Sequence, residues 1–170
     1  MSFSLLPSAV ANNVTDLTVQ FLEERDIKLL MLDFDNTIVP YTTNVPTEAV
    51  LAWLEQMKCS SIQLCVVSNS QKKRVKRFCC QYELDCITHA KKPFSKGIRE
   101  CLNRYCLPAS ASALVGDQIF TDTLGANCCG VQSILVNAID NHNFWLKARH
   151  VLELPFIYAA KKRRIGHEKS

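Results

Sequence analysis

Four short groups of polar residues could carry out phosphoryl transfer if the fold brings them together. A carboxylate can act as a nucleophile or exchange a proton, and a hydroxyl or an ammonium group can bind phosphate oxygens. Each group taken alone has an ordinary alternative, since Asp-Asn-Thr and Ser-Asn are also common capping and turn sequences. In chain order the groups are Asp33, Asp35 and Thr37; Ser68 and Asn69; Lys91 and Lys92; and Asp117 with Asp122.

The aspartates among these residues also predict a metal site. If Asp33, Asp35, Asp117 and Asp122 lie at one rim, their charges repel one another, because neighbouring carboxylates cannot all ionise without a cation. The groups offer oxygen ligands and contain no His or Cys. Oxygen ligands of this kind favour Mg²⁺, so we expect Mg²⁺ as the cofactor.

The elements that would position these groups are five apolar runs separated by helix-length amphipathic segments. Such alternation is typical of βαβ units, so the fold class expected is α/β, a Rossmann-like doubly wound parallel sheet. Each polar group follows one of the runs, and ligands of open α/β sheets bind beyond the carboxyl ends of the strands. The chain has no glycine-rich nucleotide-binding loop of the GxGxxG or GxxxxGK[ST] kind. The predicted strands are 27–34, 62–67, 86–89, 113–115 and 133–136.

Length and composition indicate one domain. The chain has 170 residues, of which 48% are hydrophobic and 21% charged. These values exclude disorder and a coiled coil, and no run has the roughly 20 apolar residues of a membrane-spanning helix. We assign 1–155 to a single domain with an N-terminal helical extension and 156–170 to a basic C-terminal tail.

The charge of +4 comes from that tail, because residues 161–170 hold five Lys or Arg and one Glu. A neutral body does not favour nucleic acid as a partner. The tail places Phe156, Ile157 and Tyr158 before four basic residues, an order suited to the surface of an anionic bilayer. The alternative is a packed last helix followed by a solvated terminus. The basic run from Lys72 to Arg77 is a second candidate for contact with lipid headgroups, or an ordinary solvated face.

Nine cysteines are present, and none forms a CxxC pair. They are interpreted as small buried hydrophobic residues rather than as zinc ligands or disulfides, which implies a reducing compartment. Residues 1–10 have no basic segment ahead of an apolar stretch, so we expect no secretory signal or Arg-rich transit peptide. The expected location is therefore cytoplasmic, with peripheral membrane contact as a further hypothesis.

Taken together, the four polar groups resemble the motifs of haloacid dehalogenase (HAD) superfamily phosphatases, and they occur in the same order. The stretches LDFDNT, VVSNS, AKKP and VGDQIFTDTLGAN are similar, more narrowly, to the YqeG-type HAD-IIIA phosphatases. Mitochondrial relatives of that group dephosphorylate phosphatidylglycerophosphate. The resemblance extends from about Leu5 to Val136, and it implies a hydrolase of phosphoric monoesters that works through an aspartyl-phosphate.

The resemblance also implies a role for each residue of the first and third groups. Asp33 is the nucleophile, Asp35 is the general acid and then the general base, and Thr37 braces the loop. Lys92 neutralises the transferring phosphoryl group. We prefer Lys92 to Lys91 because the lysine of the family pattern directly precedes a proline, as Lys92 does here.

The remaining roles concern phosphate and metal. By the resemblance, Ser68 and Asn69 bind phosphoryl oxygens together with Lys92. Mg²⁺ is held by the Asp33 carboxylate and the main-chain carbonyl of Asp35, with Asp117 as a further ligand. Asp122 binds it directly or through water.

The spacing of the groups leaves no room for an inserted cap domain, because each gap is filled by one helix and one strand. An open site suits a phosphate carried by something large. The main hypothesis is an Mg²⁺-dependent phosphatase acting on phosphatidylglycerophosphate at a membrane surface. The alternatives are a phosphatase of soluble sugar phosphates or nucleotides and, without catalysis, a phosphate-binding scaffold that retains the HAD fold. The oligomeric state is left open.

Overall fold

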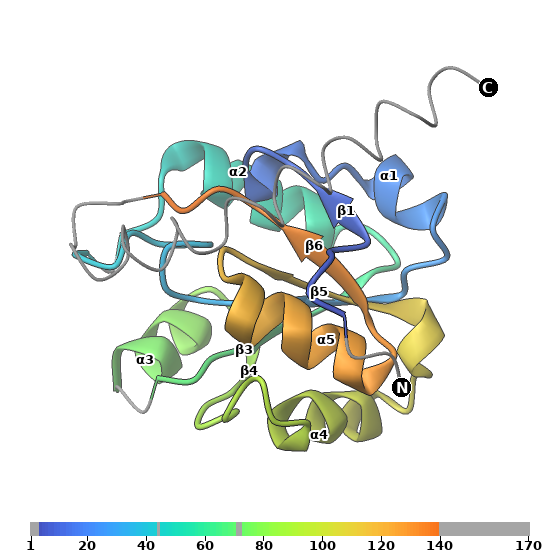
Figure 1. Cartoon of the computed structure of the whole chain (residues 1–170). Helices are drawn as coiled ribbons and strands as arrows, with labels where there is room; N and C mark the ends of the chain where they lie inside the picture. Colours follow the sequence, from blue (N-terminus) through green and yellow to red (C-terminus); the bar gives the residue numbers. More distant parts are fainter. Residues whose placement is uncertain (1–3, 44, 71–72, 140–170) are drawn as a thin grey trace.

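Six parallel strands form one sheet in the order β1-β6-β5-β2-β3-β4 (Figure 1). The computed structural model describes residues 4–43, 45–70 and 73–139. The strands are β1 (Ala9–Val10), β2 (Leu29–Leu32), β3 (Gln63–Val67), β4 (Asp85–Ile87), β5 (Ser112–Gly116) and β6 (Gln132–Leu135).

Helices cover both faces of this sheet. Side chains of α2 and α3 pack with the N-terminal segment in one hydrophobic core, and side chains of α4 and α5 pack in a second core on the other face (Figure 1). The helices are α1 (Val19–Glu23), α2 (Glu48–Lys58), α3 (Lys73–Gln81), α4 (Lys96–Tyr105) and α5 (Leu124–Cys129), with short helical turns η1 (Val14–Asp16), η2 (Ala109–Ala111) and η3 (Ile119–Thr123). The structure therefore has the Rossmann-like α/β fold that the sequence predicts.

The central strand β2 fixes the position of the first polar group. Its four residues are Leu-Leu-Met-Leu and all are buried, as expected of a parallel strand covered on both faces. Leu32, its last residue, pairs with Val66 on one side and Val115 on the other. The three strands thus end at nearly the same level, and the polar residues that follow them share one edge of the sheet.

Helix α2 begins where its sequence predicts. Thr47 is the N-cap, and its hydroxyl accepts a hydrogen bond from the Val50 N–H at 3.3 Å. Trp53 on the buried face donates its ring N–H to the Leu17 carbonyl at 2.7 Å. That bond ties the N-terminal segment to the helix, so the segment belongs to the same domain core.

All five predicted strands are present, with ends that differ by one or two residues. The N-terminal segment, expected as a helical extension, contains η1 and α1 and begins with β1, which adds a sixth, edge strand beside β6. Helix α5 lies between the fourth and fifth predicted strands, as the βαβ pattern predicts. The proposed boundary at 155 and the basic tail 156–170 lie outside the described residues.

The nine cysteines are free thiols. Cys65, Cys79 and Cys101 are buried in the two cores, as expected of small hydrophobic residues, whereas Cys59, Cys80 and Cys106 are exposed and the other three are half-buried. In the part of the chain that the structure describes, no helix combines the length and the apolar character needed to cross a membrane.

Candidate active site

The edge formed by the carboxyl ends of the strands brings three of the four polar groups side by side. Asp33 follows β2, and its N–H donates to the Val115 carbonyl at 2.8 Å. Ser68 follows β3, and its N–H donates to the Ile87 carbonyl at 2.9 Å. Asp117 follows β5 directly. Sheet pairing alone therefore gathers a nucleophile candidate, a hydroxyl and a second carboxylate.

Lys92 joins this group and lies between two of the aspartates. Its Nζ atom is 2.5 Å from Asp33 Oδ1 and 2.7 Å from Asp122 Oδ1, and its side chain is 1% exposed. Lys91 is exposed to solvent. The position of the two lysines agrees with the choice of Lys92 as the lysine that faces the site.

Burial and charge together shift the protonation of these groups. Burial raises the pKa of Asp33 to about 6 from an ordinary 3.8, Lys92 opposes the rise, and repulsion from Asp122 adds to it. Burial and the charges of Asp33 and Asp122 raise the pKa of Asp117 well above its ordinary value. Burial alone lowers the pKa of Lys92, but the charges of Asp122 and Asp33 outweigh it and the net shift is upward. The single positive charge of Lys92 therefore does not neutralise the negative charge of the three carboxylates.

The three buried carboxylates have the geometry of a cation site. One carboxylate oxygen from each of Asp33, Asp117 and Asp122 lies within 4.8 Å of the other two. Asp117 Oδ1 is buried, and no residue of the described chain gives it a hydrogen bond. A buried orphan oxygen beside two further carboxylates fits a hard divalent cation, which would supply the missing partner. The carboxylate of Asp35 lies outside this cluster; its predicted metal contact is through the main-chain carbonyl.

Asn69 holds the lysine loop in place. Its side-chain Nδ2 donates to the Lys92 carbonyl at 2.9 Å, and its Oδ1 accepts from the Lys92 N–H at 2.6 Å. The Ser68 hydroxyl accepts a hydrogen bond from the Ser70 N–H at 3.0 Å. In this structure the Asn69 side chain therefore positions Lys92, and the part of Asn69 in phosphate binding stays a prediction.

Asp35, the expected acid and base, is paired with Arg74 from α3. The two side chains form an ion pair and are 20% and 15% exposed, respectively. The Arg74 guanidinium also donates to the carbonyls of Tyr41 and Thr43 at 3.4 and 3.3 Å. It lies 5.2 Å from the ring centroid of Phe34. Arg74 therefore links α3 to the loop that carries Asp35.

The turn after Asp35 depends on Asn36. Its φ of 64° lies in the left-handed region, which asparagine tolerates better than most residues. Its Oδ1 accepts a hydrogen bond from the Tyr41 N–H at 2.9 Å. Thr37 is 1% exposed, so it lies inside the loop, which is compatible with the bracing role expected of it.

Gly116 and Arg74 contact predicted site residues, and the sequence analysis gave neither of them a role at the site. A Cβ atom on Gly116 would lie 2.3 Å from the Asp122 carboxylate, so only glycine leaves space for Asp122 at the site. The GD pair of the motif was the available signal for Gly116. Arg74 sits in the run from Lys72 to Arg77, and no pattern in the sequence separates it from its solvated neighbours.

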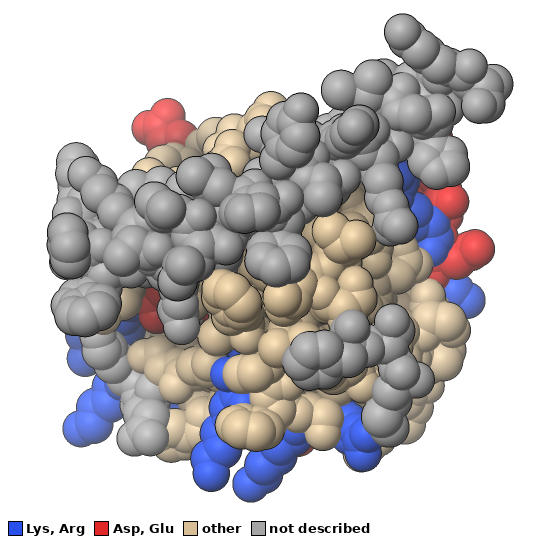
Figure 2. All heavy atoms as spheres, in the orientation of Figure 1, with Lys and Arg blue, Asp and Glu red and all other residues tan. Residues whose placement is uncertain are grey.

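Among the described residues, no cap domain is inserted beside the site. The described residues between β2 and β3 form α2 and loops, and those between β3 and β4 form α3 and loops, without a cap domain. Lys and Arg side chains gather along the lower side of the molecule in Figure 2, over α3 and α4. The Arg74–Asp35 pair shows that the start of the basic helix α3 lies beside the loop that carries Asp35.

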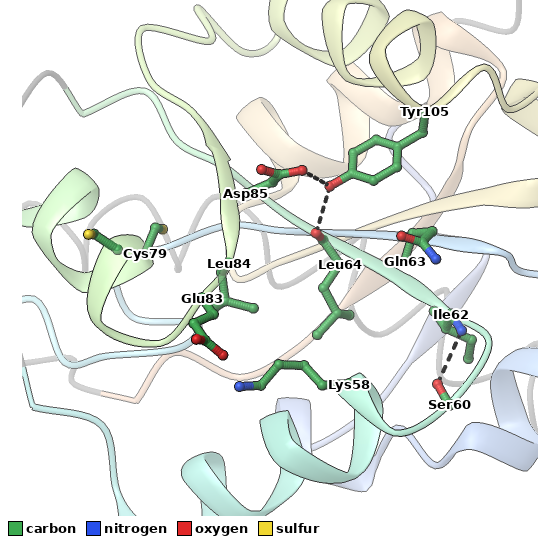
Figure 3. A pocket seen from close by; sticks show the side chains of 11 residues that line it. Lys58, Ser60, Ile62, Gln63, Leu64, Cys79, Glu83, Leu84, Asp85 and Tyr105 are labelled. Atoms are coloured by element: carbon green, nitrogen blue, oxygen red, sulfur yellow. Dashed lines mark hydrogen bonds between the residues drawn. The ribbon is translucent and has the colours of Figure 1, made fainter.

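A separate pocket of about 480 Å³ lies at the other end of the strands, beside the amino ends of β3 and β4 (Figure 3). Within it the Tyr105 hydroxyl lies 2.6 Å from Asp85 Oδ2 and 3.0 Å from the Leu64 carbonyl oxygen. None of the predicted site residues lines it. The chemistry therefore belongs to the carboxyl edge and not to this pocket.

Comparison with protein families gives a match to the model described as mitochondrial PGP phosphatase, over residues 2–139. The chain is also 31% identical over 163 residues to "Probable phosphatase YqeG" of Bacillus subtilis (strain 168). That alignment covers 95% of this chain and 94% of the relative. Both matches include all the site residues described above.

Solved structures with the same fold include the cobalt-bound deoxy-D-mannose-octulosonate 8-phosphate phosphatase of Haemophilus influenzae. It has a TM-score of 0.54 and 13% identity, covering 76% of this chain and 89% of that one. A HAD-superfamily hydrolase of subfamily IA from Geobacter sulfurreducens has a TM-score of 0.50 and 14% identity, covering 65% and 87%. At these identities the likeness establishes the fold.

Proposed function

The chain belongs to the mitochondrial PGP phosphatase family of HAD-superfamily phosphatases, and from this we propose that it hydrolyses the terminal phosphomonoester of phosphatidylglycerophosphate at a membrane surface. The single observation that carries the chemistry is the buried cluster in which Lys92 bridges Asp33 and Asp122 beside Asp117. The products are phosphatidylglycerol and inorganic phosphate.

Asp33 is the nucleophile in this proposal. Its carboxylate attacks phosphorus, a bond forms between the Asp33 oxygen and phosphorus, and the bond from phosphorus to the glycerol oxygen breaks. Water then attacks phosphorus, releases phosphate and restores the carboxylate. The Lys92 contact at 2.5 Å supports this role, because it holds the carboxylate in place and places positive charge beside the transferring group.

Asp35 moves the protons. It gives one to the departing glycerol oxygen and later takes one from the attacking water. Asp35 lies two residues beyond Asp33 on the same loop, and Arg74 holds its side chain. We assign Arg74 as a positioning residue that holds Asp35 near the mouth of the site. Lys92 forms the separate ion pair with Asp33.

Mg²⁺ is the proposed cofactor, with Asp33, Asp117 and Asp122 as its carboxylate ligands and the Asp35 carbonyl as a further one. Once bound, it offsets negative charge on the phosphate. The orphan oxygen of Asp117 supports a cation, and the all-oxygen donor set favours Mg²⁺ among the common ones.

Phosphate oxygens are bound by Ser68, Asn69 and Lys92 in this account. Ser68 is 1% exposed and follows the strand next to β2, so its hydroxyl lies on the same edge as Asp33. Asn69 acts mainly through Lys92, whose main chain it holds from both sides.

The described part of the chain has no inserted cap domain, and this supports a lipid as the substrate. A capped HAD site encloses a small molecule, whereas a site without an inserted cap suits a headgroup that remains part of a bilayer. The matching relative and family are named as phosphatases, and the family name specifies PGP. The cytoplasmic location and peripheral membrane contact expected from the sequence stay predictions.

The test is Mg²⁺-dependent phosphate release from phosphatidylglycerophosphate in mixed detergent micelles, compared with a panel of sugar phosphates and nucleotides. Asp33→Asn should abolish release. Asp26→Asn is the matched control, since Asp26 is exposed near the opposite edge of β2 and its φ of 55° suits asparagine. Preference for the soluble esters would reject the lipid as substrate and favour the soluble alternative.

A further inference from the structure

The large hydrophobic side chains that are exposed in the described part of the chain all lie in loops at the carboxyl ends of the strands. They are Tyr41 (43% exposed), Val45 (71%), Phe94 (73%) and Ile139 (41%). Each of them lies in a loop at the carboxyl edge of the sheet, where the catalytic groups are. Contiguous exposed apolar side chains mark interaction surfaces, whereas single ones scattered over a protein do not.

Hydrogen bonds tie three of these loops to the catalytic groups. The N–H groups of Tyr41 and Ile139 both donate to Asn36, the neighbour of Asp35, at 2.9 and 3.0 Å. The Phe94 N–H donates to the Lys91 carbonyl at 2.8 Å, directly beside Lys92. The apolar side chains thus frame the mouth of the site from two sides.

Val45 also lies in a loop beside the mouth of the site. Arg74, which pairs with Asp35, donates to the Thr43 carbonyl at 3.3 Å, and the Thr43 hydroxyl lies 3.5 Å from the Val45 carbonyl. This chain of contacts places Val45 over the α3 side of the mouth, opposite the Phe94 loop.

Basic residues predominate beside the aspartates of the site. In the described loops after β3 and β4, the first five residues of α3 and the first four of α4, every charged residue is a Lys or Arg. Of these, Lys92 and Arg74 turn inward to Asp33 and Asp35, whereas Lys73, Arg77 and Lys91 are exposed. Part of this basic surface is visible over α3 in Figure 2.

We propose that these residues form a membrane-docking face, in which Tyr41, Val45, Phe94 and Ile139 enter the interface of an anionic bilayer while Lys73, Arg77 and Lys91 bind its headgroups. The proposal rests on the proposed function and deepens it. Apolar side chains beside basic ones are the combination that binds such an interface, and each basic residue near the surface adds about 1 kcal/mol. The loops after β3 and β4 and the helix starts that follow them present basic residues with no acidic ones between them, a charge that complements an anionic surface.

Docking in this orientation turns the catalytic edge toward the lipid. Asp33 then faces the headgroup layer, so the phosphomonoester can reach it while the acyl chains stay in the bilayer. The buried carboxylates do not repel the anionic surface, because Lys92 and the cofactor compensate them. The docking face therefore takes part in substrate recognition, a role that the cap domain has in capped HAD enzymes.

The experiment is cosedimentation of the full chain with phosphatidylcholine vesicles that contain or lack phosphatidylserine, a lipid with negative charge and no phosphomonoester. The double variant V45S/F94S should lower the partition coefficient on the anionic vesicles about tenfold or more. Phe94→Leu, which keeps an apolar side chain, should retain binding. Lys73→Gln should lower binding about fivefold, and the matched control Lys28→Gln, exposed at the opposite edge of the sheet, should not.

Hydrolysis of p-nitrophenyl phosphate, which is soluble, should be unchanged in V45S/F94S, since these side chains do not contact the reacting groups. Unchanged vesicle binding by the double variant would overturn the docking face, as would equal binding with and without phosphatidylserine. Sedimentation velocity without vesicles gives a third test. If the double variant converts an oligomer to a monomer and still binds vesicles, this face is an interface between copies of the chain and the docking face is refuted. Hydrolysis of phosphatidylglycerophosphate in detergent tests the proposed function separately.

Discussion

Substitution of Gly116 by alanine tests whether the fourth motif works through the position of Asp122. An added Cβ would lie 2.3 Å from both Cγ and Oδ2 of Asp122, and 2.6 Å from its Cβ. Ordinary contact begins near 3.4 Å, so the carboxylate must move by about 1 Å. Displacement of a ligand or a catalytic group on this scale costs about 10–100-fold in metal affinity or turnover. Overpacking of the site should also destabilise the fold by about 1–3 kcal/mol.

The assay combines calorimetric titration of Mg²⁺, turnover, and thermal unfolding of the same preparations. Gly130→Ala is the matched control, because Gly130 has a φ of 72° and a Cβ there would meet only Ala109 at 3.9 Å. It should lose about 1 kcal/mol of stability through backbone strain, with Mg²⁺ affinity intact. If Gly116→Ala keeps both its Mg²⁺ affinity and its turnover, the argument from Asp122 is wrong.

Three further outcomes follow from the same geometry. With the soluble substrate p-nitrophenyl phosphate, Lys92→Met should reduce turnover about 10²–10³-fold, whereas Lys91→Met should leave it unchanged; equal effects in steady-state assays would contradict the placement of the two lysines. The pKa of Asp33 is raised to about 6 in the metal-free fold, so the folded state binds more protons than the unfolded state between about pH 4 and 6. Metal-free stability should therefore fall as pH rises through that range, and Mg²⁺ should raise the melting temperature more at neutral pH than near pH 5. A shift independent of pH, measured by calorimetry, would count against it. Arg74→Gln should lower kcat about tenfold and alter its pH profile, and Arg74→Lys should restore part of it, since Arg74 holds Asp35; an unchanged profile with a lowered melting temperature would reduce Arg74 to a structural residue.

Most of the site could be predicted from the sequence because most of its residues directly follow strands of a parallel sheet. Parallel strands end at one edge, so the residues that follow apolar runs must meet there. Asp33, Ser68 and Asp117 obey this rule directly. Lys92 reaches the same place from the loop after β4, and its distinction from Lys91 came from the following proline.

Other features depend on contacts that no local pattern encodes. Strand β1 has two residues, and it exists because its backbone pairs with Ile134 and Leu135, about 125 positions away. Arg74 belongs to a run that is typical of a solvated helix, and only its pairing with Asp35 distinguishes it.

The apolar residues of the docking face were missed for a related reason. Val45 and Phe94 are hydrophobic in sequence, and hydrophobic residues are most often interpreted as core. Their exposure follows from loops that lie across the rim of the sheet, away from both cores. The tail, which the sequence analysis favoured for bilayer contact, lies outside the described residues.

The central claim is that Asp33 is phosphorylated during hydrolysis of the lipid phosphomonoester. The direct measurement is to quench the enzyme with borohydride while it turns over phosphatidylglycerophosphate, and to map the modified peptide by mass spectrometry. Borohydride reduces an acyl phosphate to an alcohol, so the account predicts homoserine at position 33, absent without substrate and absent in Asp33→Asn. Turnover of the lipid with position 33 unmodified, or with the modification at another carboxylate, would contradict it.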